Sequence, residues 1–395
     1  MEATSVVEAD PFLELRKFVA PEFVFGLDAR KLVGRYAQNV GARRVLLVTD
    51  KVLHARTPWV RETVATLEEY GIPCVVFDGV SPNPRSAEVT DGAACYARER
   101  CNAVVAVGGG SVMDCAKGIG IVCSNGGGIL DFEGVDRVGR PMPPLICLPT
   151  TAGTASEVSQ FTIILDENRK TKIAIVSKAT VPDVGLIDPA TTMTMDAYLT
   201  ACTGMDALTH AVEAFVSNAG SPITDLHAME AIRLVHAALP AVIARPDDIG
   251  LRGRMMLGSL QAGLAFSNAI LGAVHAMAHS LGGFLDLPHG ECNAILLGPV
   301  IAGNYGAARE KYQAVGRVFG LSLAGMTDEA AAAALREAVE AFRRGLGITA
   351  TLGSLGVERT SVSLLAALAL KDACMATNPR ALSLRATEAI YESAF

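Results

Sequence analysis

The stretch AVVAVGGGSVMDCAK, residues 103–117, predicts a strand, a tight turn and a helix in direct succession. Its first five residues are apolar and rich in valine, which is typical of a buried strand. Gly108, Gly109 and Gly110 then form the turn, and Ser111 opens the helix. Backbone N–H groups at the positive end of a helix dipole can hold a phosphate there. A turn that binds no ligand also accounts for the glycines, so both interpretations stand at this point.

Further runs rich in valine, isoleucine and leucine surround this unit in the first half of the chain. The clearest are Val45 to Thr49, Cys74 to Phe77 and Leu145 to Leu148, and they alternate with helical stretches. This alternation predicts a parallel sheet with helices on both faces, a Rossmann-like α/β arrangement. Two more β-rich runs, Phe161 to Leu165 and Lys172 to Val176, flank a polar turn and predict a hairpin that accompanies the sheet.

The second half of the chain differs from the first in composition and periodicity. After Asp188 and Pro189 come long alanine- and leucine-rich segments with helical periodicity, and Glu329 to Arg344 predicts an exposed amphipathic helix. We therefore expect a domain boundary near residue 195, with an α/β domain over residues 1–195 and an all-helical domain over residues 196–395.

Composition favours a cytoplasmic protein that acts on small molecules. The length of 395 residues suffices for two domains, and a net charge of −7 with mixed signs argues against nucleic acid or an anionic membrane as partner. The nine cysteines show no C-x-x-C pair, which favours reduced thiols. The start, MEATSVVEADPFLELRKF, has no basic region followed by an apolar run, so we expect no secretory signal.

One stretch raises the question of a membrane, because Met255 to Leu285 contains no charged residue. Polar side chains such as Gln261, Asn268 and His275 interrupt it, and these are costly against lipid. We expect this stretch to be buried inside the protein.

Asp50 suggests which dinucleotide the glycine turn would serve. It ends the strand VLLVTD, where a carboxylate can accept hydrogen bonds from ribose hydroxyls and repel the extra phosphate of NADP. This favours NAD. The order is unusual, because Asp50 precedes the glycines by about sixty positions, so the ordinary Rossmann fingerprint is not met.

Four residues in two short segments have the chemistry of metal ligands. Asp206 and His210, in GMDALTHAVEA, are four apart and so leave the same face of a helix. His275 and His289 lie in HAMAHSLGGFLDLPHG, where we expect Gly282 and Gly283 to turn a loop that brings His289 back to the helix. Three imidazoles and one carboxylate suit Fe(II) or Zn(II) better than Mg(II) or Ca(II).

Each of these histidines alone is more simply a hydrogen-bonded core residue. The chain has seven histidines, however, and four of them fall in two segments that are poor in charge. An unpaired imidazole is costly in such surroundings, so a shared metal explains the placement better.

Five separated motifs together resemble the iron-containing (group III) alcohol dehydrogenase family, closest to the lactaldehyde reductase and propanediol oxidoreductase type. They are GGGSVMDCAK, PTTAGTASEVS, GMDALTHAVEA, HAMAHSLGGFLDLPHGECNAILL and DACMATNPR. The resemblance runs nearly end to end and implies a dehydroquinate synthase-like fold, with an NAD-binding α/β domain and a helical metal-binding domain. It also implies iron as the metal, although the ligands themselves would accept zinc.

The resemblance assigns roles to individual residues. It implies that the metal is bound by Asp206, His210, His275 and His289. It implies that NAD is bound by Asn83, Gly109, Gly110, Ser111, Asp114, Thr150, Thr154 and Lys172. Pocket-facing positions correspond to Phe161, Phe266, Leu271 and Cys374, for which ordinary core packing is the alternative. Some relatives that act on diols have a polar residue where Phe161 stands, so an aromatic ring there suggests a less polar substrate or a narrowed pocket.

These features lead to an expected reaction. We expect hydride transfer between NAD(H) and a small primary alcohol or diol, or its aldehyde, in a cleft between the two domains. His279 is our candidate for relaying the proton, with orientation of ligand or substrate as the alternative.

Other functions remain open from sequence. They are a regulatory protein that retains the fold, a glycerol dehydrogenase, a maleylacetate reductase and a 3-dehydroquinate synthase. We also expect a homodimer or larger homo-oligomer, in which PEFVFG near the N-terminus could form an edge strand that pairs between subunits.

Overall fold

The computed structural model describes residues 15–395, and its first half is a six-stranded parallel sheet. The strand order is β1-β9-β6-β4-β2-β3. The strands are β1 (Glu22–Phe25), β2 (Val45–Val48), β3 (Cys74–Phe77), β4 (Ala103–Gly108), β6 (Leu145–Pro149) and β9 (Val184–Ile187). The predicted parallel sheet is therefore confirmed, with strand ends shifted by one residue in three places. The strand β9 was not predicted, and it lies between β6 and β1.

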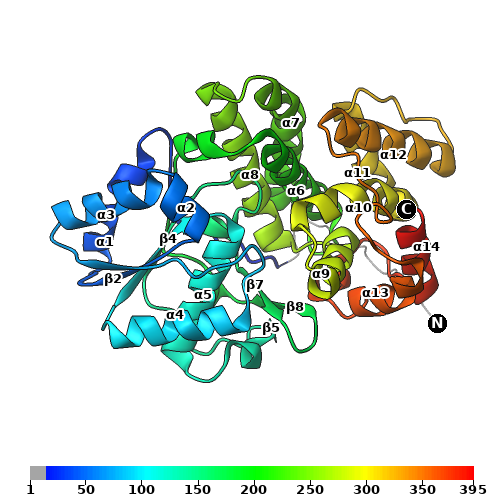
Figure 1. Ribbon diagram of the computed structural model, residues 1–395. Coiled ribbons are helices and arrows are strands. Elements are labelled where there is room, and N and C mark those ends of the chain that lie inside the picture. The colour runs from blue at the N-terminus through cyan, green and yellow to red at the C-terminus, as the bar shows by residue number, and fades with distance from the viewer. Residues whose placement is uncertain (1–14) are drawn as a thin grey trace, which may run out of the picture.

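Helices cover both faces of this sheet, as predicted (Figure 1). They are α1 (Val33–Asn39), α2 (Lys51–Arg56), α3 (Trp59–Glu69), α4 (Ser86–Arg98) and α5 (Gly110–Asn125). Side chains alternate along each strand. Leu46 and Val48 accordingly pack into the core beneath α4 and α5, while Val45 and Leu47 pack beneath α1 and α3.

The predicted hairpin is formed by β7 (Phe161–Asp166) and β8 (Thr171–Val176), which pair antiparallel. It belongs to a second, three-stranded sheet in which the short strand β5 (Gly134–Val135) pairs with β8. In Figure 1 the hairpin lies between the α/β half and the helical half. It contacts α5 on one side through β7 and α9 (Ala273–Leu285) on the other through β8.

The second half of the chain is helical, as predicted. After α6 (Ala197–Val216) come α7 (Pro222–Ala244), α8 (Ile249–Ala269), α9, α10 (His289–Asn304), α11 (Arg309–Val318), α12 (Asp328–Gly345), α13 (Val362–Ala369) and α14 (Leu384–Glu392). Helices α6, α7 and α8 pack together, and α6 also contacts α10. The expected amphipathic helix is α12, which buries Leu335 and Val339.

The uncharged stretch from Met255 to Leu285 forms the end of α8 and all of α9, which meet at 98°. Most of its side chains are buried, as expected. Within residues 15–395, α7 is the one single helix long and apolar enough to cross a membrane, and 39% of its most apolar window is buried. Helices α8 and α9 reach that length and composition only when they are taken together as one bent span.

The N-terminal predictions have different outcomes. The expected edge strand is β1, which pairs with β9 of the same chain and forms one border of the sheet. The secretory-signal prediction rests mainly on residues 1–14, which lie outside the described part. The boundary near residue 195 stays a prediction. Helix α6 begins there, with the side chain of Asp196 accepting a hydrogen bond from the backbone N–H of Leu199.

Candidate active site

Helix α6 presents a stripe of ionisable side chains to the interior. Asp206, His210 and Glu213 are spaced by four and three residues, so they lie on one face of the helix. All three are buried, with exposed fractions of 2%, 4% and 4%. Asp206 and His210 are predicted metal ligands, whereas Glu213 was not among the predicted site residues.

Helices α9 and α10 supply the other two predicted ligands. His275 is the third residue of α9, and His289 is the first residue of α10. The prediction that Gly282 and Gly283 turn a loop is wrong, because both glycines lie inside α9. The chain turns instead at Asp286, which has a left-handed backbone with φ of 56° and ends the helix. His289 therefore sits on a helix terminus.

The two glycines have another role, which is close packing. A Cβ atom on Gly283 would lie 2.7 Å from the Cα of Thr171, and one on Gly282 would lie 2.9 Å from the Nζ of Lys172. The contact at Gly283 is with backbone and would force the two elements apart, whereas the contact at Gly282 is with the flexible end of a side chain. The glycines thus let α9 of the helical half approach the β7–β8 hairpin.

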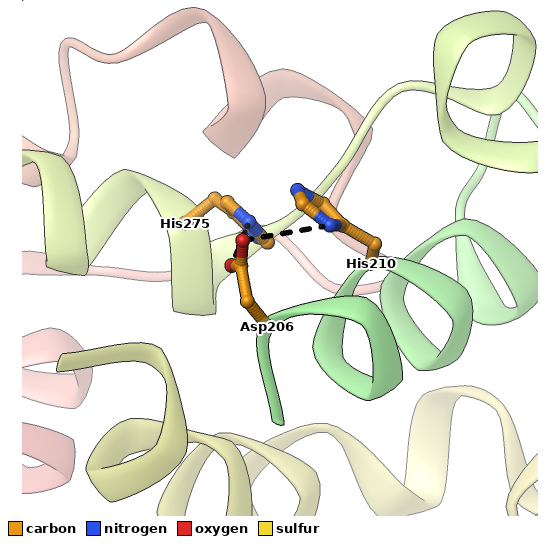
Figure 2. Close-up of side chains that lie close together, drawn as sticks. All are labelled: Asp206, His210 and His275. Atoms are coloured by element: carbon orange, nitrogen blue, oxygen red, sulfur yellow. Dashed lines mark ion pairs between the residues drawn. The ribbon is translucent and has the colours of Figure 1, made fainter. Parts of the chain in front are cut away.

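The four predicted ligands converge around Asp206 (Figure 2 shows three of them). Its Oδ1 lies 3.6 Å from Nε2 of His275 and 3.7 Å from Nε2 of His289, and its Oδ2 lies 4.0 Å from Nδ1 of His210. Ligand atoms bonded to one tetrahedral ion at about 2.0–2.1 Å lie about 3.4 Å apart. The separations from His275 and His289 are close to that spacing, and the separation from His210 is about 0.6 Å longer.

The burial and charge of this cluster are suited to a bound cation. Burial opposes ionisation, but the neighbouring imidazoles hold the pKa of Asp206 below its usual range. Burial also lowers the pKa of His210 to about 4 and that of His289 well below its usual value. Within residues 15–395, the buried Nδ1 atoms of His210 and His289 have no hydrogen-bond partner. Burial opposes protonation of His275, but hydrogen bonds to Asp206 and Glu213 raise its pKa to about 9. The neutral imidazoles of His210 and His289 beside a buried carboxylate fit a borderline divalent cation.

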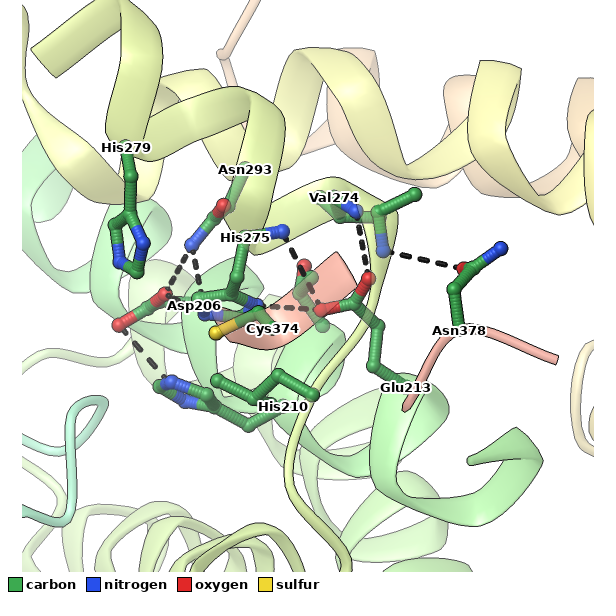
Figure 3. Close-up of polar contacts among 12 residues, drawn as sticks. Asp206, His210, Glu213, Val274, His275, His279, Asn293, Cys374 and Asn378 are labelled. Carbon is green, nitrogen blue, oxygen red and sulfur yellow. Dashed lines mark hydrogen bonds and ion pairs between the residues drawn. The ribbon is translucent and has the colours of Figure 1, made fainter. Parts of the chain in front are cut away.

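Glu213 contacts His275 on the Nδ1 side of the ring, away from Asp206, and orients it (Figure 3). Its Oε2 lies 2.6 Å from Nδ1 of His275, and its Oε1 accepts a hydrogen bond of 2.6 Å from the backbone N–H of Val274. The carboxylate thus accepts a hydrogen bond from a backbone N–H in the first turn of α9 that has no partner within the helix. It also fixes Nε2 as the lone-pair nitrogen of His275. Its position seven residues after Asp206 in a helical segment was the available sequence clue.

Asn293 was also missed, and it lies among the ligands. Its Nδ2 donates to Oδ1 of Asp206 at 2.6 Å and lies 3.1 Å from Nε2 of His275 (Figure 3). The same Nδ2 lies 3.1 Å from Nε2 of His289. Asn293 follows His289 by one helical turn on α10, which places its amide against the same cluster.

His279 lies one turn beyond His275 on α9, as predicted, and is paired with Asp372. Nδ1 of His279 lies 2.8 Å from Oδ2 of Asp372. Burial opposes ionisation of Asp372, but the neighbouring His279 lowers the pKa of this carboxyl. The ionised carboxylate therefore accepts a hydrogen bond from the Nδ1–H of His279. Nε2 of His279 is then the basic nitrogen.

A cleft with an empty volume of about 750 Å³ joins the histidine cluster to the glycine turn. Most of the predicted site residues line it, namely Asn83, Gly110, Ser111, Asp114, Phe161, Lys172, Thr154, Phe266, Leu271, His279 and the four predicted metal ligands. In the described part of the chain, Asp50, Gly109, Thr150 and Cys374 are predicted site residues outside that lining.

The glycine turn forms a cradle at one end of the cleft. Gly109 precedes the first turn of α5, and a Cβ on Gly110 would lie 2.7 Å from the side chain of Thr154. Only glycine fits there without displacement. The free N–H groups at the start of α5 can therefore be approached closely by a phosphate.

Two ionisable residues, Asp114 and Lys172, also line the cleft. Burial raises the pKa of Asp114 to about 6, and its Oδ1 accepts a hydrogen bond of 2.8 Å from Ser156. Burial lowers the pKa of Lys172.

Asp50 has a local partner set. Its Oδ1 accepts hydrogen bonds from the backbone N–H groups of Val52 and Leu53 at 2.8 and 2.9 Å, so it caps α2. Its predicted contact with ribose stays a prediction.

An aromatic wall flanks the histidine cluster. The ring of Phe266 stacks on His210 with centroids 4.3 Å apart and meets Phe161 at 5.7 Å. Cys374 is fully buried, and its backbone N–H donates to Asp372, so the alternative of core packing fits it better than the pocket.

Known proteins resemble the chain over nearly its full length. The model of the iron-containing alcohol dehydrogenase family matches residues 20–189, and that of the family's C-terminal domain matches residues 200–395. A 1,3-propanediol dehydrogenase of Klebsiella pneumoniae is 42% identical over 94% of this chain and 96% of its own. An NAD-dependent methanol dehydrogenase of Bacillus methanolicus is 36% identical over 95% and 99%. The crystal structure of a 1,3-propanediol oxidoreductase superposes with a TM-score of 0.92 at 41% identity, covering 97% of this chain and 100% of that one.

These matches agree with the cleft, in which a cluster of three histidines and one aspartate faces a glycine cradle. The chain therefore belongs to the iron-containing alcohol dehydrogenase family and is an oxidoreductase of alcohols or aldehydes.

Proposed function

We propose that the protein transfers a hydride between NAD(H) and a small primary alcohol or its aldehyde, in the cleft between the sheet and the helices. The supporting observation is that one continuous cleft contains both the glycine cradle and the Asp–His₃ cluster. A boundary near residue 195 would then separate a cofactor domain from a metal domain.

The two ends of the cleft have distinct tasks. Gly109, Gly110 and Ser111 would hold the pyrophosphate at the start of α5. Asp206, His210, His275 and His289 would hold the metal, which supplies Lewis acidity and lowers the pKa of an alcohol hydroxyl. The remaining predicted cofactor residues, Asp50, Asn83, Asp114, Thr150, Thr154 and Lys172, would position the rest of the dinucleotide.

His279 would move the proton. Asp372 accepts a hydrogen bond from the Nδ1–H of His279. The Nε2 of His279 is then available to take a proton from the substrate hydroxyl or to return it to the aldehyde. The position of His279 in the lining of the cleft supports a proton relay over a purely structural role.

The aromatic wall favours an apolar alcohol over a diol. Phe161, Phe266 and Leu271 line the cleft at the end with the histidines and offer a second hydroxyl no hydrogen-bond partner. The Klebsiella relative is named for 1,3-propanediol and the Bacillus relative for methanol, so short primary alcohols are the substrate class to test.

Two wider proposals concern the setting of the enzyme. We propose that it acts in the cytoplasm, since all nine of its cysteines are free thiols. We propose a homodimer or larger homo-oligomer in which the exposed border of β1 meets a second copy.

A substrate panel tests the proposal. Iron-loaded protein is assayed for NAD reduction with a series of primary alcohols from methanol to hexanol and with 1,3-propanediol. We expect butanol to exceed 1,3-propanediol in kcat/KM, and Phe161→Asn to reverse this preference. A wild-type preference for the diol, or an unchanged ratio in the variant, would contradict the substrate assignment. Inactivity toward all of them would contradict the proposed reaction.

A further inference from the structure

The turn between α9 and α10 is joined to the cofactor side of the cleft by side-chain contacts. Asp286 occupies this turn, three residues before the predicted ligand His289. The Nδ2 of Asn83 donates a hydrogen bond of 2.6 Å to Oδ1 of Asp286, across 203 residues of sequence. Arg85 reaches the other oxygen, with Nη2 to Oδ2 at 3.2 Å. One carboxylate thus receives donors from two residues of the loop that follows β3.

Arg85 is itself held in several directions. Its Nε contacts Glu167 of the β7–β8 turn at 3.2 Å, and its Nη1 donates to Oγ of Ser81 at 2.7 Å. The loop, the hairpin and the α9–α10 turn therefore meet at one guanidinium. Charge-assisted contacts of this kind have more geometric specificity than neutral ones.

The loop contributes to the cofactor cleft itself. Asn83 is 8% exposed and lines the cleft together with the start of α5. The hydroxyl of Ser111, in the first turn of α5, donates to the backbone carbonyl of Pro82. Movement of the loop would therefore change the cradle proposed for the pyrophosphate.

We infer that Asp286 is a positioning residue that fixes the Asn83–Arg85 loop as part of a preformed dinucleotide site and ties that site to the helix terminus of His289. The inference rests on the proposed binding of NAD(H) in this cleft. Without the carboxylate, the loop must be ordered at each binding event, and that ordering weakens affinity.

Two variants test the inference in the metal-loaded full-length protein. Asp286→Asn removes the charge yet tolerates the left-handed backbone, and Arg85→Ala removes the guanidinium. Arg385→Ala, an exposed arginine on α14, is the matched control. NADH affinity and dissociation rate are measured by stopped-flow fluorescence. We expect each cleft variant to bind NADH about fivefold more weakly, mainly through faster dissociation. The loss in the double variant should be smaller than the product of the two single losses, because both variants remove the same contact between Arg85 and Asp286.

Kinetics and hydrogen exchange distinguish positioning from general destabilisation. We expect KM for NAD to rise while kcat changes less than twofold. Without cofactor, the backbone amides of residues 81–86 should exchange faster in both cleft variants than in the control. Unchanged exchange together with NADH affinity within twofold of wild type would overturn the inference. Failure of the wild-type protein to bind NADH would instead overturn the proposed function, and the exchange result would then decide whether the contact itself orders the loop.

Discussion

Replacing Glu213 by glutamine should weaken both the fold and the metal site. The carboxylate makes two short contacts, 2.6 Å to Nδ1 of His275 and 2.6 Å to the backbone N–H of Val274, and it is 4% exposed. A glutamine amide has one oxygen, so one of these donors would face an NH₂ group and lose its acceptor. Losing a charge-assisted hydrogen bond and leaving a buried donor unpaired costs about 2–4 kcal/mol of unfolding free energy.

The same change should lower metal affinity. Carboxylates behind a metal-binding histidine typically contribute about 10–100-fold in affinity. We expect the dissociation constant for Zn(II) or Fe(II), measured by chelator competition, to rise by at least tenfold in Glu213→Gln. Glu230→Gln, at an exposed position on α7, is the control for stability and should leave urea unfolding unchanged. Metal affinity within threefold of wild type, with the same unfolding midpoint as the control, would refute this account of Glu213.

Four further predictions concern other parts of the molecule. Asn293→Ala should lower metal affinity about tenfold in chelator competition, because the amide that donates to Asp206 and orients this carboxylate is lost; unchanged affinity would contradict this. Burial raises the pKa of Glu157 to about 7. The folded state therefore retains a proton that the unfolded state releases, so the contribution of Glu157 to the unfolding free energy should fall by about 2–3 kcal/mol as pH rises from about 5 to 8. Urea titrations of Glu157→Gln should lack this part of the pH dependence, and an unchanged pH dependence would contradict the assignment. Gly283→Ala should destabilise by about 1–3 kcal/mol, because its Cβ meets hairpin backbone at 2.7 Å, whereas Gly345→Ala meets no atom within 4 Å and should not. His279→Gln should reduce kcat about 100-fold without changing metal stoichiometry.

The fold followed from sequence where local pattern determines structure. Strands such as Ala103 to Val107 were found because parallel strands buried on both faces are continuous apolar runs. The strand β9 was missed, since Val184 to Ile187 is short and includes a glycine. That the hairpin forms a separate sheet depends on pairing between distant segments, which spacing alone does not fix.

The predicted enzyme class, iron and NAD agree with the family and its relatives. The convergence of Asp206, His210, His275 and His289 also followed from helical spacing and burial of histidine. The mistaken loop at Gly282 and Gly283 shows the limit of that argument, because glycine serves close packing as well as turning. Glu213, Asn293 and Asp372 were not found because their roles depend on contacts between helices, and a single acidic or amide residue in a helical segment looks like many others.

Metal reconstitution of a ligand variant tests the central claim most directly. Metal-free wild-type protein and His289→Ala are reloaded anaerobically with Fe(II), and bound iron and NAD reduction by butanol are measured on the same samples. We predict one iron per chain and metal-dependent turnover for the wild type, with loss of both in the variant. Full iron binding and full activity in His289→Ala, or equal turnover by metal-free wild-type protein, would contradict the account.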